Sequence, residues 1–196
     1  MSKGTILYVG SFELPDNDAA SHRVLSNAKI FRELGYDVVF MGCDKSLSYD
    51  SDIIATVKQI QGFDSFFTSY PTSKKQWIHY LSNIDSFKRI LEQYNDVEFV
   101  ICYNYQAIAL RKIISLCHKK SIKIIGDCTE WYSAKNRGLA FFLLKGSDVF
   151  YRMTILQKKL DGLIVISNYL ERYYKKSSQI INIPPLVDLS EEKWQV

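Results

Sequence analysis

The chain has 196 residues, of which 47% are hydrophobic and 14% aromatic, so it can bury a sizeable core and whole-chain disorder is excluded. The net charge of +4 is a mild basic excess that fits helix capping and solubility better than a nucleic-acid surface. The 4 cysteines form no C-x-x-C pair, and no stretch reaches the roughly 20 apolar residues of a membrane span. We therefore expect a cytoplasmic domain with no metal, no cofactor and no nucleic-acid partner.

Short apolar runs alternate with helical patterns along the whole chain. The expected strands are residues 5–9, 37–41, 55–60, 99–102, 122–125, 163–166 and 180–183. The expected helices run from the Asp18 cap to Gly35, over 73–94, over 105–119, brokenly over 138–160, and from a cap at Ser167 or Asn168 to Lys176, while residues 63–70 are hard to assign. This alternation predicts an α/β fold, a doubly wound parallel sheet in a Rossmann-like single domain.

Ligands of such sheets bind beyond the carboxyl ends of the strands, near the point where the strand order reverses. The loops that follow Val9, Cys102, Ile125 and Ile166 are therefore the candidate site. The first of these loops reads GSFELPDNDAA and holds one glycine, so the dinucleotide pattern G-x-G-x-x-G is absent. NAD or FAD binding is not expected.

The stretch DGLIVISNYLERYYKKSSQIINIPPLVD, residues 161–188, reads as strand, helix, strand and a proline turn. It resembles the close of the first domain of GT-B glycosyltransferases, the retaining, nucleotide-sugar-dependent "group 1" kind. Their turn commonly reads P-N-G-V-D, whereas here Pro-Leu replaces Asn-Gly. The resemblance covers nearly the whole chain. It implies that residues 1–188 are an N-terminal, acceptor-side domain and that residues 189–196 begin the linker to a donor-binding domain absent from this sequence.

The resemblance assigns donor contacts to the first loop and helix. Family members often carry paired glycines there, and here either Asp18-Ala19 or Ala19-Ala20 stands in their place. A helix N-terminus offers N–H groups to an anion, although the Asp18 carboxylate opposes a phosphate. Arg23 is a cation near the positive end of a helix, which hints at an anionic partner. A simple capped loop and a solvated charge are the alternatives.

The loop GDCTEWY, residues 126–132, is the second candidate site. Carboxylates accept hydroxyl hydrogens and an indole face stacks on a sugar ring, so Asp127 and Glu130 are interpreted as catalytic, orienting the acceptor or acting as general base. Thr129 stands where many family members place a histidine, which puts any histidine-dependent step in doubt. The predicted acceptor-binding residues are Tyr103, Asn104, Thr129 and Trp131. Loop hydrogen bonds and packing are the alternatives.

The run LAFFLL, residues 139–144, is more apolar than a surface helix requires. It predicts either a peripheral contact with a membrane or lipid-linked acceptor, or a covered helix. The resemblance implies sugar transfer from a nucleotide-sugar to a glycan or lipid-linked acceptor with retention, in polysaccharide or capsule biosynthesis, with this chain alone inactive. The alternatives are a non-catalytic Rossmann-like binding or scaffold module and, less favoured, a GT-B epimerase.

Overall fold

One eight-stranded sheet organises the described part of this computed structural model, which comprises residues 2–48, 57–129, 146–176, 178–189 and 191. The strands lie in the order β3-β4-β2-β1-β5-β6-β7-β8 and all neighbours are parallel except β3 and β4. Their bounds are β1 Thr5–Gly10, β2 Asp37–Asp44, β3 Lys58–Ile60, β4 Phe63–Ser69, β5 Val97–Tyr103, β6 Lys123–Cys128, β7 Gly162–Val165 and β8 Gln179–Asn182. The chain leaves β1 toward β2 and later returns to β5 on its other side, so the strand order reverses between β1 and β5.

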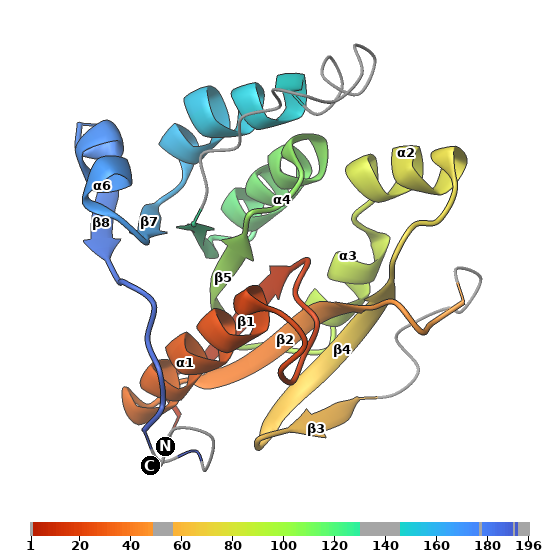
Figure 1. The fold of residues 1–196 in the computed structure, drawn as a ribbon, viewed down its shortest axis with the longest axis horizontal. Coiled ribbons are helices and arrows are strands. Elements are labelled where there is room, and N and C mark those ends of the chain that lie inside the picture. The colour runs from red at the N-terminus through yellow and green to blue at the C-terminus, as the bar shows by residue number, and fades with distance from the viewer. Residues whose placement is uncertain (1, 49–56, 130–145, 177, 190, 192–196) are drawn as a thin grey trace.

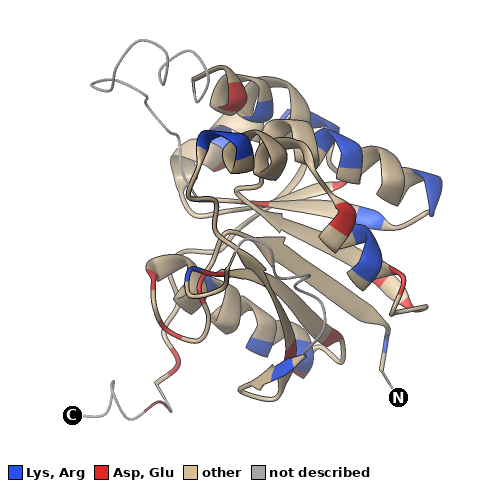
Figure 2. Cartoon of the chain, turned by 90° about the vertical axis from the view of Figure 1, so that its right-hand side faces the viewer, with Lys and Arg blue, Asp and Glu red and all other residues tan. Residues whose placement is uncertain are grey.

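Helices cover both faces of the sheet, as Figure 2 shows from the side. The helices are α1 Ala19–Glu33, α2 Lys74–Ser82, α3 Asp85–Leu91, α4 Ala107–Lys119 and α6 Asn168–Tyr174, with a π-helical turn Arg152–Leu156 and a 3-10 turn Gln157–Lys159. The α1 helix packs on one face, and α3, α4, the π-helical turn and α6 pack on the other. This arrangement confirms the doubly wound α/β prediction.

Alternate residues of β1 enter opposite cores, as the two-residue period of a strand requires. Tyr8 packs with Val24 and Phe40 beneath α1, whereas Leu7 and Val9 pack beneath α3 and α4. All 6 residues of β1 are buried, which explains why the sequence reads as an unbroken apolar run. The 4 cysteines are buried and unbridged.

Helix ends follow the predicted local chemistry. Asp18 caps α1 by accepting a hydrogen bond from the backbone N–H of Ser21, and Gly35 follows the helix with φ +92°. Ser167, one of the two residues proposed as the last cap, accepts from the backbone N–H of Leu170. The segment following β8 then runs back beside α1, as Figure 1 shows.

Three expected elements differ in the structure. The predicted helix over 73–94 is two helices, because the Asn83 side chain accepts from the backbone N–H of Asp85 and starts a new turn. Trp77, which the helical spacing over 73–94 would direct inward, is 38% exposed on α2. The unassigned residues 63–70 contain β4, a parallel partner of β2. The strand expected at 55–60 appears as the short antiparallel β3, with residues 55 and 56 outside the described part.

Candidate functional site

A cleft of about 380 Å³ opens beside α1 and reaches the carboxyl ends of β5, β6 and β7. Its walls include Arg23 from α1, Tyr103 at the end of β5, Thr129 after β6, and Ile166 after β7. Residues 185–188 also line the cleft. The cleft therefore lies where the strand order predicted a ligand site.

A buried ion pair lies at the floor of this region. Asp127, in β6, is 0% exposed, and Arg23 from α1 donates to it through Nε at 2.9 Å and Nη2 at 2.8 Å. The Tyr8 hydroxyl donates to the other carboxylate oxygen, and Asn27 donates to Tyr8 at 3.2 Å. Burial raises the pKa of Asp127, and the Arg23 guanidinium opposes that rise. The network fastens β1, α1 and β6 together.

This geometry bears on two predicted site residues. The anionic partner that the sequence suggested for Arg23 is Asp127 of the same chain, and Arg23 Nη1 also donates to the Ile183 carbonyl at 2.9 Å. Both carboxylate oxygens of Asp127 in turn accept hydrogen bonds from neighbouring side chains, and the residue is fully buried. The catalytic role of Asp127 and the phosphate contact of Arg23 stay predictions, and each would require the pair to open.

The N-terminus of α1 is acidic rather than anion-binding in character. The Asp18 carboxylate already occupies the N–H of Ser21, and Ala19 is exposed at the first helical position. Asp16 lies close to His22 Nε2, and both line the cleft with Ala19. Carboxylates at this end oppose a phosphate, so the donor contacts predicted for Asp18, Ala19 and Ala20 gain no support here and stay predictions.

Three predicted acceptor residues come together after β5 and β6. Asn104 Nδ2 donates to Thr129 Oγ1 at 2.7 Å, and Thr129 Oγ1 donates to the Tyr103 hydroxyl at 3.2 Å. Asn104 has φ 41°, an uncommon conformation for a residue with a side chain. Hydroxyl and amide groups of this kind exchange hydrogen bonds with sugar hydroxyls. Glu130, Trp131 and the run 139–144 lie outside the described residues.

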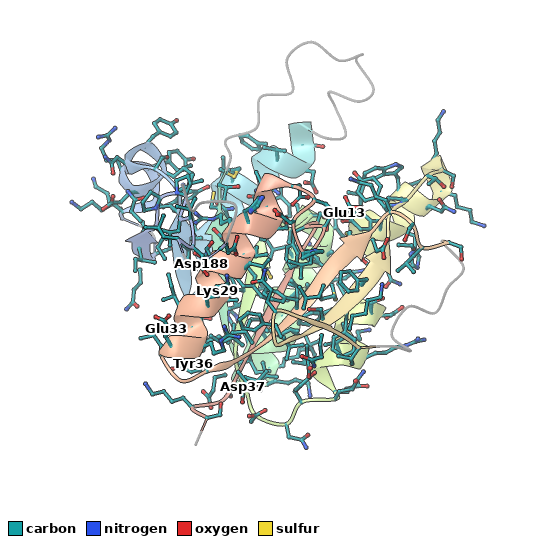
Figure 3. All side chains as sticks on the ribbon, turned by 60° about the horizontal axis from the view of Figure 1, so that its bottom comes forward. Glu13, Lys29, Glu33, Tyr36, Asp37 and Asp188 are labelled. Carbon is teal, nitrogen blue, oxygen red and sulfur yellow. The ribbon has the colours of Figure 1, made fainter. Side chains whose placement is uncertain are left out.

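A C-terminal strap, defined here as residues 183–189 and 191, was missed by sequence reasoning. Lys29 Nζ lies 2.5 Å from Asp188 and 2.9 Å from Glu191, and Ser26 donates to the Leu186 carbonyl at 3.4 Å. Figure 3 shows Lys29 on α1 beside Asp188. Two positions carried a signal for the buried network: Tyr8 is the one polar side chain in an apolar strand centre, and Asn27 follows Arg23 by one helical turn.

Among the described residues, no group of three His, Cys, Asp or Glu side chains is placed to hold a metal ion. Within those same residues, no helix is long and apolar enough to cross a bilayer.

No protein-family model matches the sequence, and no curated protein matches it. Solved structures do resemble the fold. The catalytic domain of starch synthase IV from Arabidopsis thaliana, bound to ADP and acarbose, matches with a TM-score of 0.61 and 13% identity, covering 96% of this chain and 53% of that one. The fold is that of one GT-B domain.

Two further glycosyltransferases share this fold. An alpha-glucosyltransferase in complex with UDP and a 13-mer DNA gives a TM-score of 0.52 at 12% identity, covering 97% of this chain and 44% of its own. Phytolacca americana UGT2 gives 0.50 at 11% identity, covering 94% and 52%. The chain thus spans about half the length of the solved structures it matches, and these comparisons confirm the GT-B resemblance at the level of fold.

Proposed function

We propose that this chain is the acceptor-side domain of a glycosyltransferase that moves a sugar from a nucleotide-sugar to a glycan or lipid-linked acceptor with retention. The observation that carries the proposal is the Tyr103–Asn104–Thr129 cluster, which borders a cleft at the carboxyl edge of a GT-B sheet. The ADP, UDP and acarbose of the structural neighbours support a nucleotide and a sugar as ligands.

The acceptor is placed here for a chemical reason. The described edge of the cleft offers hydroxyl, amide and carboxylate groups, and the one arginine in its wall is neutralised by Asp127. Such a lining suits neutral sugar hydroxyls, whereas a donor diphosphate requires cations or unoccupied N–H groups. The donor would therefore be held mainly by a second domain, and polysaccharide or capsule assembly is the setting we propose.

The test is a transfer assay on the whole protein, with a panel of nucleotide-sugars and the release of nucleoside diphosphate as readout. We expect turnover by the whole protein, none by residues 1–196 alone, and a product that keeps the donor's anomeric configuration by NMR. In Thr129→Val, loss of the hydroxyl should raise the KM for acceptor and leave the KM for donor unchanged. Thr72→Val removes the same hydroxyl at an exposed site and should change neither.

A non-catalytic binding or scaffold module is the second candidate. The closed Arg23–Asp127 pair and the threonine at position 129 favour it, because both remove groups that chemistry at this edge could use. A whole protein that binds nucleotide-sugar or glycan but releases no nucleotide with any donor would support the module and contradict the enzyme.

The peripheral membrane contact through residues 139–144 and a cytoplasmic location remain proposals. DNA is bound by one structural neighbour, so the expected absence of a nucleic-acid partner is also open to a direct binding assay.

A further inference from the structure

A second arginine lies buried at the same edge of the sheet. Arg152 begins the π-helical turn Arg152–Leu156 and is 6% exposed. Its Nη1 donates to the carbonyls of Asn104 at 2.6 Å and Tyr105 at 3.3 Å. The guanidinium therefore lies directly behind the segment that carries the predicted acceptor residues.

The charge of Arg152 is not compensated within the described part of the chain. Both of its hydrogen bonds come from Nη1, and Nε is buried with no hydrogen-bond partner. No described carboxylate forms an ion pair with it. A guanidinium has five N–H donors, and a buried cation without a counter-ion is unfavourable. The described residues therefore supply no counter-ion for this guanidinium.

The carboxylate nearest to Arg152 in the sequence, that of Asp148, accepts a hydrogen bond from another element. Asp148 precedes Arg152 by one helical turn, but its Oδ1 accepts from the backbone N–H of Ala107 at 2.8 Å. That bond supplies the cap of α4, because Gln106 at the N-cap position makes no side-chain cap. Asp148 thus fastens the start of α4 rather than neutralising Arg152.

Two backbone features mark the same place. π-Helical turns are rare and occur often at functional sites, and this one starts at Arg152. Asn104, whose carbonyl receives Arg152, has φ 41°, and its side chain bonds to Thr129. The cation without a described counter-ion, the unusual turn and the residue at positive φ lie together at the carboxyl ends of β5 and β6.

We propose that Arg152 forms an anion subsite that receives a phosphoryl group at this edge. An oxyanion there would accept from the guanidinium in the charge-assisted geometry that arginine favours. This inference rests on the proposed function for its meaning, since it names the ligand chemistry as a phosphorylated acceptor or a nucleoside diphosphate. The binding itself is a property of this chain and is measured without any transfer reaction.

The experiment is calorimetric titration of residues 1–196 with pyrophosphate. We expect saturable binding that Arg152→Gln weakens by about tenfold or more, the range of one lost charge-assisted contact. Arg152→Lys keeps the charge and should lose less. Arg111→Gln is the matched control, because it removes a guanidinium from the exposed side of α4 and should leave binding unchanged. Equal affinity in Arg152→Gln and the unaltered chain would overturn the proposal.

A second measurement needs no variant, in case Arg152→Gln fails to fold. Amide NMR of the unaltered chain with pyrophosphate should shift the signals of Asn104, Tyr105 and Thr129. Shifts confined to another surface, or no binding because a carboxylate of this chain already neutralises Arg152, would overturn the subsite. Geranyl pyrophosphate and UDP then distinguish the two possible carriers of the phosphoryl group. Tighter binding of geranyl pyrophosphate would indicate a lipid-linked acceptor, and tighter binding of UDP would indicate a nucleotide. Loss of transfer with anion binding intact would count against the proposed function alone.

Discussion

Arg23 and Arg152 are two arginines with the same 6% exposure, on opposite faces of one sheet edge. Every nitrogen of the Arg23 guanidinium has a partner: Nε and Nη2 reach Asp127, and Nη1 reaches the Ile183 carbonyl. Arg152 bonds through Nη1 alone, to two carbonyls, and its Nε is left without a partner.

The difference distinguishes an arginine whose charge is paired within the chain from one that we propose is available to a ligand. A buried charge that is paired and fully hydrogen-bonded needs no further partner, whereas a buried charge without a counter-ion is stabilised by binding one. The sequence favoured Arg23 as the ligand contact because it lies near a helix N-terminus. Contacts across the fold show that Arg23 is paired with Asp127, which is why we propose Arg152 as a ligand contact, and the contact predicted for Arg23 stays a prediction.

The largest expected effect comes from breaking the Arg23 pair. Asp127→Ala should lower the free energy of unfolding by about 3–5 kcal/mol, because it strands a buried guanidinium. Urea denaturation monitored by circular dichroism measures this. Asp37→Ala removes an exposed carboxylate at the start of β2 and should cost no more than about 0.5 kcal/mol. Similar urea midpoints for Asp127→Ala and Asp37→Ala would show that the buried ion pair contributes little to the free energy of unfolding.

Replacing each arginine by methionine sharpens the comparison. Arg23→Met strands the Asp127 carboxylate and should cost about 3–5 kcal/mol. Arg152→Met strands no carboxylate among the described residues and loses only bonds to two carbonyls, so about 1–2 kcal/mol is expected. The same denaturation assay applies, and a larger loss in Arg152→Met would mean that Arg152 has a structural anionic partner.

Tyr8→Phe should have an intermediate effect of about 1–2 kcal/mol, since it keeps the ring but removes the hydrogen bond to the Asp127 carboxylate and the one accepted from Asn27. A double-mutant cycle with Asp127→Ala isolates the bond to Asp127. The two substitutions should be clearly non-additive. Strict additivity would indicate that Tyr8 contributes through packing alone.

The smallest expected effect concerns the C-terminal strap. Burial lowers the pKa of Lys29, but the hydrogen bonds to Asp188 and Glu191 raise it overall above its ordinary value of 10.5. The folded state therefore holds this proton more tightly. The stabilisation is present below pH 10.5 and is lost as the pH rises through the raised folded-state pKa.

Lys29→Met tests this at neutral and alkaline pH. The loss near pH 7 should be no more than about 1 kcal/mol, because the pair is partly solvated. Amide hydrogen exchange in residues 186–189 should quicken, and the loss of stability at alkaline pH should become smaller. Lys3→Met, which removes an exposed lysine, is the control. An unchanged alkaline profile in Lys29→Met would contradict the assignment.

Local chemistry predicted most of the fold. Buried β-branched runs gave the central strands, and the caps at Asp18 and Ser167 and the stop at Gly35 lie where their side-chain chemistry places them. The break at Asn83 was missed because the apolar spacing continues through it from Leu81 to Phe87. The spacing of apolar residues cannot reveal a break in a helix when a single residue departs from helical backbone angles.

The site was less predictable because its contacts are non-local. The sequence placed Asn104 and Thr129 at neighbouring strand ends, and their hydrogen bond follows from the parallel sheet. Arg23 and Asp127 are 104 residues apart, and nothing in either neighbourhood indicates that they pair. The unsatisfied Nε donor of Arg152 likewise depends on contacts across the fold, and the sequence does not show it.

The most direct test compares the Nε–Hε signals of the two arginines in ¹⁵N NMR spectra of residues 1–196, before and after addition of pyrophosphate. The Arg23 signal should exchange slowly with solvent and stay in place, because Asp127 holds it in both states. The Arg152 signal should move to the position of an oxyanion-bonded guanidinium. Movement of Arg23 with a fixed Arg152 signal, or no movement of either, would contradict the assignment of Arg152 as the arginine that awaits a ligand.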